Sequence, residues 1–411
     1  MTNYNNRSAA RSVKIIILLF FFLGLTNFLF ADRSPDLTLA KELMNEGLYE
    51  LAYDEFIDFA VKNGDSPKVA EAYYFASDCL FLQGNYSAAL SKYKDYIRKF
   101  PFEKFTVFAK ERLGEVYLKL ADYENAEKTF IAFLKNYPDN EKTEDALYWL
   151  GETYYAKKES KKAEYYYKLC IKKYPKGKFY DYALYSTGYC LDNEGQYDEA
   201  EGYYKTLIDS FPKSSVTEDA YIAIGEIKVK ENKPDEALKV FANYRKRYPH
   251  GRLYDKSLFL TGKLLKKENK TSLAVSTFHR LIEKFPDSEY RDFAYYYIGW
   301  IYFEGKNYPE ALKNFSLIKK GSKLYFAAFY WSAITLEKMG KREKAIVRYR
   351  ELASQNSAGG FQKDAIYELA RIAYEDKNTP EGDSLVSSLA NTDRKWKALM
   401  LRKITQRQRN I

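Results

Sequence analysis

The residues that most often carry catalysis or hold metal ions are scarce in this chain, and their spacing fits no familiar reaction centre. Three cysteines and two histidines occur, at Cys79, Cys170, Cys190, His250 and His279, and neither histidine neighbours a cysteine. Zinc sites and activated nucleophiles need such side chains at characteristic spacings. The sequence also lacks the glycine-rich loop that holds nucleotides. We therefore expect no catalytic residue, no metal site and no cofactor.

The numerous carboxylates do not indicate a paired acid and base. Residues such as Asp122, Glu124 and Asp198 recur on the turns and helix faces of a repeating pattern. Repeated charges of this kind are typical of solvated helix faces and caps. The protein is therefore not expected to be an enzyme.

An internal repeat dominates the sequence and must position any surface that the protein uses. Equivalent residues recur every 37 residues, and a further copy follows at Gly340 after 34 residues. Each copy is followed five residues later by alanine and nine residues later by an aromatic residue. The copies that keep the 37-residue period are Gly47, Gly84, Ala121, Lys158, Gly195, Asn232, Asn269 and Lys306. Self-similarity with such a period indicates a solenoid.

Residues 105–138 show what one repeat should form. Apolar residues recur at helical spacing up to residue 120, a turn follows, and a second apolar helix face begins at Ala126. Pro138 closes the unit because proline cannot continue a helix. Gly114 and Ala126 would let the two helices cross closely, and Phe130 would fill the space beside them. The sequence therefore predicts an all-α fold of antiparallel helix pairs.

This repeat resembles the tetratricopeptide repeat. The resemblance rests on Leu113-Gly114, Tyr117, Ala126, Phe130 and Pro138, and the same signature recurs in other repeats. It implies a right-handed superhelical solenoid, and the usual period of the family is about 34 residues. The longer, proline-marked repeats of this chain are similar to those of bacterial envelope members, such as the BamD-like and CpoB-like (YbgF) proteins.

The repeat pattern also sets the expected domain limits. We expect nine repeats over residues 36–356 and a degenerate tenth repeat over residues 357–390. In the tenth repeat, Thr379-Pro380-Glu381-Gly382 is expected to break the helical pattern between a first helix and a shorter second one. A basic amphipathic helix over residues 391–411 is expected to cap the solenoid.

In the family, the first helix of each repeat lines a concave groove that receives a partner. Three residues before the internal glycine, six of eight first helices carry an aromatic residue, and Glu111 and Ile222 are the exceptions. Such rings would either anchor a partner or stack between neighbouring repeats, and the period alone does not separate the two. The aromatic positions are Tyr74, Tyr148, Tyr185, Phe259, Tyr296 and Tyr330.

Charges along the first helices give the expected groove a direction. Asp78 and Glu115 follow the internal small residue in early repeats, whereas lysines and Trp300 occupy later ones. We therefore expect a groove that is acidic toward the N-terminus and basic near residues 256–267, which would orient a partner. The residues added to the candidate binding surface are Trp300, Lys263, Lys266 and Lys267.

The first 31 residues have the features of a secretory signal peptide. Basic residues precede the apolar run that begins at Ile15, and the segment ends with the small residue Ala31. An uncleaved membrane anchor is the alternative. In an oxidising compartment Cys170 and Cys190, expected on neighbouring helices, would allow a disulfide. We favour buried thiols because the solenoid core needs no covalent staple.

These features together predict a non-catalytic scaffold that binds other proteins of the bacterial envelope, in the periplasm or at the periplasmic face of a membrane. Two alternatives remain, namely a peptidoglycan- or polysaccharide-binding module and a membrane-anchored assembly factor. The basic segment Arg394–Arg409 would be the part that touches a membrane surface. Nucleic acid is not expected as a partner because the chain is exported and its net charge of +10 is diffuse. No small-molecule substrate is expected.

Overall fold

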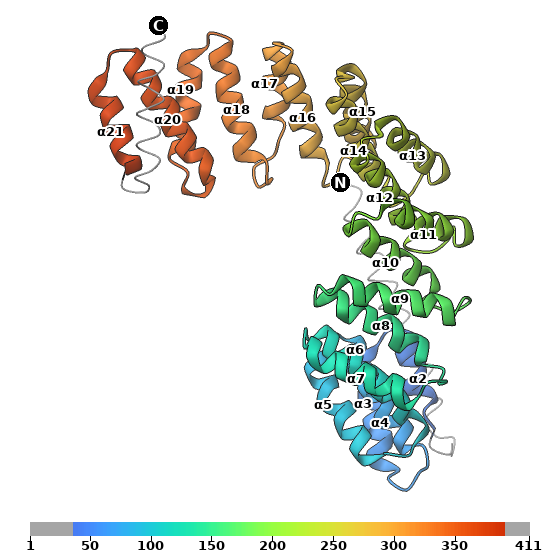
Figure 1. Cartoon of the computed structure of the whole chain (residues 1–411). Coiled ribbons are helices and arrows are strands. Elements are labelled where there is room, and N and C mark those ends of the chain that lie inside the picture. Colours follow the sequence, from blue (N-terminus) through green and yellow to red (C-terminus); the bar gives the residue numbers. More distant parts are fainter. Residues whose placement is uncertain (1–35, 391–411) are drawn as a thin grey trace, which may run out of the picture. The chain divides into compact units, whose positions relative to one another are not determined.

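The computed structural model describes residues 36–390, and all regular secondary structure in this range is helical. Figure 1 shows the helices following one another as hairpins along the chain. The predicted all-α solenoid of antiparallel helix pairs is confirmed for this range. The signal peptide or anchor expected in residues 1–31 and the capping helix expected in residues 391–411 lie outside the described residues.

Ten helix pairs, each with a first and a second helix, make up the described part of the chain. The short 3-10 helix η1 (Asn356–Ala358) precedes the last pair. The pairs are α2 (Thr38–Asn45) and α3 (Tyr49–Lys62), α4 (Val69–Leu82) and α5 (Tyr86–Lys99), α6 (Lys104–Lys119) and α7 (Tyr123–Asn136), α8 (Thr143–Ala156) and α9 (Ser160–Lys173), α10 (Tyr180–Asn193) and α11 (Tyr197–Ser210), α12 (Thr217–Lys230) and α13 (Pro234–Arg247), α14 (Tyr254–Lys267) and α15 (Thr271–Lys284), α16 (Arg291–Glu304) and α17 (Tyr308–Ser316), α18 (Tyr325–Lys338) and α19 (Arg342–Ala353), and α20 (Gly360–Glu375) and α21 (Thr379–Ala390).

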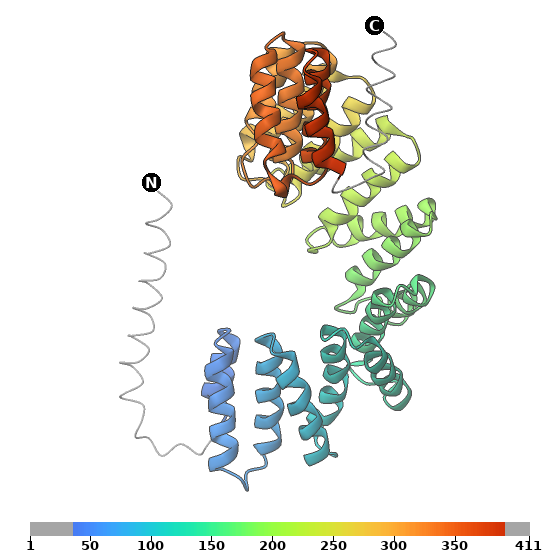
Figure 2. The ribbon, with the colours of Figure 1, turned by 90° about the vertical axis from the view of Figure 1, so that its left-hand side faces the viewer.

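The described residues group into two compact units, one up to Cys190 and the other from Leu191 onward. Within each unit, helices that follow one another in the chain pack together, for example α3 with α4 and α14 with α15. Figure 2 shows this arrangement for α18–α21 of the second unit, which lie side by side. Each helix pair therefore buries its apolar face against the next pair, because one pair alone leaves that face open to water.

The 37-residue period marks the left-handed turn between the two helices of each pair. Ala121 has φ 58° and Lys158 has φ 63°, and glycine takes the same place at Gly84 with φ 78°. After α6, the amide of Asp122 donates to the carbonyl of Tyr117 at 2.9 Å, and the amide of Ala121 donates to the carbonyl of Leu118. These are the two bonds of a Schellman motif, which satisfies carbonyl groups at the helix end.

The internal glycines let each aromatic ring of the second helix approach the first helix. A Cβ atom added to Gly114 would lie 2.5 Å from the ring of Phe130. At Gly262 it would lie 2.5 Å from the ring of Phe278. Both rings are fully buried. The predicted combination of a small residue and a space-filling ring is therefore confirmed, and the ring replaces the volume that a larger first-helix residue would occupy.

The tenth pair corrects one expectation. Thr379-Pro380-Glu381-Gly382 begins α21 and does not break the pattern. Proline is tolerated in the first helical turn because its missing amide hydrogen would have no partner there. The preceding turn residue, Lys377, has φ 61° and lies 37 residues after Gly340, so the period resumes after the shortened interval. That interval contains α17, which ends at Ser316.

All three cysteines are buried, and Cys79 and Cys170 are free thiols. The structure therefore does not contain the disulfide between Cys170 and Cys190 that the sequence would have allowed. Burial raises the pKa of Cys79 and Cys170 to about 12. Both thiols are consequently protonated at neutral pH and act as small apolar side chains of the core.

Candidate partner-binding surface

Three of the predicted aromatic residues stack against the following repeat. The rings of Tyr74 and Phe105 are stacked with centroids 4.9 Å apart, and those of Tyr148 and Phe179 are 4.5 Å apart. In the second unit, Phe259 stacks on Tyr290 at 5.0 Å. In each case the partner ring lies 31 residues later, at the beginning of the next first helix. These contacts join successive repeats. At these three positions the rings therefore stack between repeats, which was the alternative to anchoring a partner.

This packing removes the same three residues from the accessible surface. Tyr74 is 5% exposed, and Tyr148 and Phe259 are each 8% exposed. Burial raises the pKa of both tyrosine hydroxyls well above the usual value. The structure therefore does not contain an exposed row of six rings, and these three side chains are largely closed to a partner.

The remaining three rings of the ladder are half-buried. Tyr185 lies near Tyr189 with centroids 6.4 Å apart, and Tyr330 lies 5.9 Å from Phe361. Tyr296 lies 6.4 Å from Trp300 on the same helix. These rings keep part of their surface open and remain candidates for partner contact.

The one first helix that carries an acid at the ladder position keeps that acid buried. Glu111 is 1% exposed, and its Oε1 atom has no hydrogen-bond partner. Burial, followed by the nearby Glu115 carboxylate, raises the pKa of Glu111 well above its usual value, although Arg112 acts in the opposite direction. The folded state therefore favours the neutral form of the Glu111 side chain at pH values above the usual glutamate pKa. Thirty-one residues later, where the stacked repeats have Phe105, Phe179 and Tyr290, the chain has Lys142.

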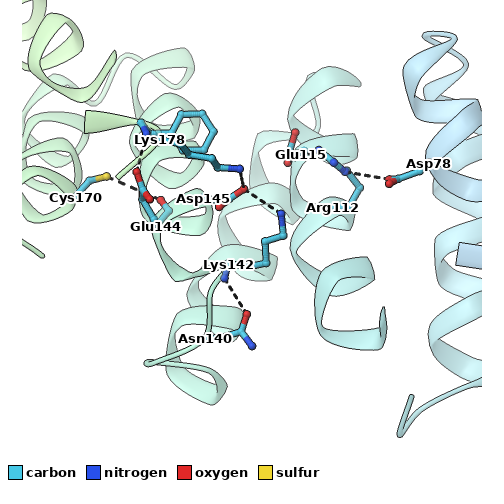
Figure 3. A network of polar contacts seen from close by, with 10 residues as sticks. Asp78, Arg112, Glu115, Asn140, Lys142, Glu144, Asp145, Cys170 and Lys178 are labelled. Carbon is cyan, nitrogen blue, oxygen red and sulfur yellow. Dashed lines mark hydrogen bonds and ion pairs between the residues drawn. The ribbon is translucent and has the colours of Figure 1, made fainter. Parts of the chain in front are cut away.

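Two acids that follow the internal small residue of their first helices, Asp78 and Glu115, take part in a network that joins first helices of the first unit. Figure 3 shows Arg112 of α6 directed toward Asp78 of α4. The Nε atom of Arg112 lies 3.2 Å from Asp78 Oδ1, and its Nη1 atom lies 2.7 Å from Glu115 Oε1. Tyr93 also donates its hydroxyl to Asp78. The predicted acidic end of the surface is therefore largely buried and neutralised by internal partners.

Further along the first unit, two neighbouring acids of α8 bind the start of α10. Glu144 accepts a hydrogen bond of 2.6 Å from the backbone amide of Phe179, while Lys142 and Lys178 both pair with Asp145 (Figure 3). Gly177 leaves room for the Glu144 carboxylate, which would have to shift if a Cβ were added at position 177. These acids stabilise the junction between repeats and are not available to a partner.

The second unit presents a different surface on its first helices. Lys263 and Lys267 of α14 are exposed, and neither forms an ion pair with any residue between 36 and 390. Lys266, by contrast, pairs with Glu304 of α16 at 3.1 Å. Trp300 of α16 is half-buried and lies 4.2 Å, centroid to centroid, from Trp331 of α18. The first helix α14 therefore carries cationic groups, and the following first helices α16 and α18 carry the aromatic pair.

Sequence reasoning missed part of this aromatic cluster. Trp331 and Phe303 contact each other with centroids 5.5 Å apart, and Phe303 lies 5.8 Å from Trp300. Trp331 follows the shortened 34-residue interval, so counting with a fixed period does not align it with the earlier first helices. The signal that could have found it is the tryptophan itself, which is rare in this chain.

Among residues 36–390, no group of three or more histidine, cysteine, aspartate or glutamate side chains could hold a metal ion. No helix of this range has the length and apolar character needed to cross a membrane.

The fold is that of a helical-repeat scaffold for protein interactions, and the family models identify its class. A model described as tetratricopeptide repeat matches residues 37–104 and 111–178. A second model with the same description matches residues 182–214, 219–251, 256–288, 293–320 and 327–357. The chain therefore belongs to the tetratricopeptide repeat family, whose members are generally non-catalytic scaffolds. The comparison with curated proteins found no match.

Several solved structures have a similar fold. The C-terminal part of a tetratricopeptide repeat protein from Cytophaga hutchinsonii is 15% identical, covers 63% of this chain and 99% of its own, and has a TM-score of 0.50. A tetratricopeptide repeat protein from Parabacteroides merdae is 17% identical and covers 63% of this chain and 95% of its own, with a TM-score of 0.44. PilW, described as a widely conserved type IV pilus biogenesis factor, is 19% identical and covers 55% of this chain and 98% of its own, also with a TM-score of 0.44. At these identities the likeness concerns the fold alone.

Proposed function

We propose that this protein is a non-catalytic scaffold of the bacterial envelope, and that it binds a protein partner on the first helices α14, α16 and α18. The proposal rests on the exposed lysines Lys263 and Lys267 of α14, which form no ion pair within residues 36–390, and on the half-buried rings of Trp300 and Trp331 on the two following first helices. Aromatic side chains bury a large area at small entropic cost, and unpaired cations attract carboxylates. A partner segment with both acidic and apolar side chains fits this surface.

The envelope location rests on the N-terminal sequence. A basic start, an apolar run and a small residue at Ala31 favour export, and the periplasm or the periplasmic face of a membrane is the compartment that follows. Peptidoglycan or polysaccharide binding receives less support, because a continuous row of exposed rings would be needed and Tyr74, Tyr148 and Phe259 are buried. A membrane-anchored assembly factor would use the same surface and differ only at its N-terminus.

Site-specific crosslinking in the native cell tests this proposal. A photoreactive residue at position 300 should crosslink to a defined protein, and Lys263→Glu together with Lys267→Glu should reduce the yield. The matched control reverses the charge of two exposed lysines on second helices, Lys239 and Lys344, and should leave the yield unchanged. The proposal fails if position 300 yields no protein crosslink, or if the control pair reduces the yield as much as the first pair.

Location is tested separately by mass spectrometry of the mature chain and by cell fractionation. A chain that begins at Asp32 and is recovered in the periplasm agrees with cleavage. A chain that retains residues 1–31 and sediments with membranes indicates the anchored alternative. Recovery in the cytoplasm would contradict both.

A further inference from the structure

One junction between repeats departs from the apolar pattern of the others. The last turn of the second helix carries isoleucine or leucine in five other repeats, and the first helix carries alanine at one buried position in eight other repeats. The aliphatic residues are Ile97, Leu134, Ile171, Ile208 and Ile282, and the alanines are Ala72, Ala109, Ala146, Ala183, Ala220, Ala294, Ala328 and Ala365. At the junction of α13 with α14, Arg245 and Ser257 stand at these two positions.

The two polar residues contact each other directly. The Nη1 atom of Arg245 donates to Ser257 Oγ at 2.7 Å and to Thr261 Oγ1 at 2.8 Å. Ser257 is fully buried and Thr261 is 6% exposed. The hydroxyls therefore hold the guanidinium in one orientation through a single nitrogen. The Nε and Nη2 groups of Arg245 make no hydrogen bond within residues 36–390. Both groups remain accessible to solvent.

Two more cations surround the tyrosine at the start of α14. Arg280 of α15 donates from Nη2 to the hydroxyl of Tyr254 at 2.8 Å. Lys284, at the end of α15, lies with its Nζ atom 3.8 Å from the centroid of the Tyr254 ring. None of Arg280, Lys284 and Arg245 forms an ion pair with a carboxylate of the described range.

This concentration of positive charge is electrostatically unfavourable when no anion is bound. Burial lowers the pKa of Arg245, and the nearby Arg280 lowers it further, although Tyr254 acts in the opposite direction. A partly buried cation is normally accompanied by a carboxylate, since its transfer from water is otherwise costly. The neighbouring repeats show that an aliphatic side chain suits this position, so the packing of the fold does not require the arginine.

We infer that Arg245, Arg280 and Lys284 form a binding site for a phosphate-type oxyanion at the α13–α15 junction. The guanidinium of Arg245 would supply Nε and Nη2 as a planar pair of donors, which match two oxygen atoms of a tetrahedral anion. Arg280 and Lys284 would supply the remaining charge. This site lies on different helix positions from the proposed partner surface and does not depend on it.

The test compares the full chain with a double variant that restores the residues of the neighbouring repeats, Arg245→Ile with Ser257→Ala. Thermal unfolding is followed in inorganic phosphate and in chloride at equal ionic strength. Phosphate should stabilise the unmodified chain more than chloride does, because ligands that bind only the folded state raise its stability. In the variant, the same stabilisation should need roughly tenfold to hundredfold more phosphate, the range expected for loss of a charge-assisted hydrogen bond.

A second variant, Arg280→Gln, covers the case in which the double variant fails to fold, because Arg280 is exposed on α15. Its phosphate response should also be weakened. Equal responses to phosphate and chloride in the unmodified chain would overturn the inference, as would an unchanged phosphate response in both variants.

The phosphate group could be free or carried by a lipid headgroup, and co-sedimentation separates these sources. Vesicles of phosphatidylglycerol are compared with vesicles of phosphatidylcholine, with and without inorganic phosphate as competitor. Sedimentation with the anionic vesicles that the double variant loses indicates a lipid headgroup. Stabilisation by inorganic phosphate without vesicle binding indicates a free anion.

Discussion

The left-handed turn at position 121 allows a prediction whose sign is unusual. Ala121 has φ 58°, a conformation that costs an alanine about 1–2 kcal/mol relative to glycine. Glycine also gains freedom in the unfolded chain, which offsets about 0.4–1 kcal/mol. Ala121→Gly should therefore stabilise the protein by about 0.5–1 kcal/mol. Lys158→Gly should act similarly, because φ there is 63°.

Two control substitutions carry the opposite expectation. Ala132→Gly, in the exposed middle of α7, should destabilise by about 0.8–1 kcal/mol, because glycine is a poor helix former. Gly84→Ala, at an equivalent turn with φ 78°, should destabilise by about as much as Ala121→Gly stabilises.

Urea unfolding followed by circular dichroism measures these differences, and hydrogen exchange of amides in α6 and α7 reports the local effect. The local measurement matters because a chain of two units need not unfold in one step. If Ala121→Gly and Ala132→Gly destabilise the protein equally, the proposed cost of the left-handed turn is wrong.

Three further predictions concern packing and buried acids. Gly262→Ala should destabilise by about 1–3 kcal/mol through overpacking against Phe278, and Phe278→Leu in the same chain should recover part of this loss. Glu111→Gln should stabilise the protein increasingly as pH rises from 4.5 toward 7. The raised pKa means that the folded state keeps a proton which the unfolded state releases, so the unmodified chain loses stability over this window. Tyr167→Phe should cost about 1.5–3 kcal/mol, because its hydroxyl donates to Glu152 at 2.7 Å in a buried setting.

Thermal melts check the first of these predictions, and urea titrations at several pH values check the second and third. An additive loss in the Gly262 and Phe278 double variant would show that the two residues do not share the space assigned to them. A stability difference between the unmodified chain and the Glu111→Gln variant that is constant with pH would contradict a neutral buried carboxyl. The Tyr167 prediction fails if the phenylalanine variant is as stable as the unmodified chain.

The repeat geometry could be predicted from the sequence because it depends on local residue types. Gly114, Phe130 and Pro138 each have one physical role in a helix pair, and the structure places all three as their types require. The tenth pair was harder to predict, because a proline such as Pro380 can either end a helix or stand in its first turn. Only the 37-residue distance from Gly340 to Lys377 indicates that a new helix begins here.

The surface was less predictable than the fold. Tyr74 and Tyr296 occupy the same position within their repeats, yet Tyr74 is buried and Tyr296 is half-buried. Tyr74 stacks on Phe105 of the following repeat, whereas the matching residue after Tyr296 is Leu324, because the interval from Lys306 to Gly340 is three residues shorter. The exposure of such a tyrosine thus depends on two successive repeats, and it cannot be predicted from one repeat alone.

The stacked pairs have a consequence for how such a chain can change over generations. Tyr74 stacks on Phe105 and Tyr148 stacks on Phe179, so at these junctions a repeat is matched to the one that follows it. Duplicating or exchanging a single 37-residue unit would therefore place a ring beside an unsuitable neighbour at one of its two ends. Recombination that preserves such junctions would have to move pairs of repeats. The contacts between stacked rings therefore constrain the order of these repeats along the chain.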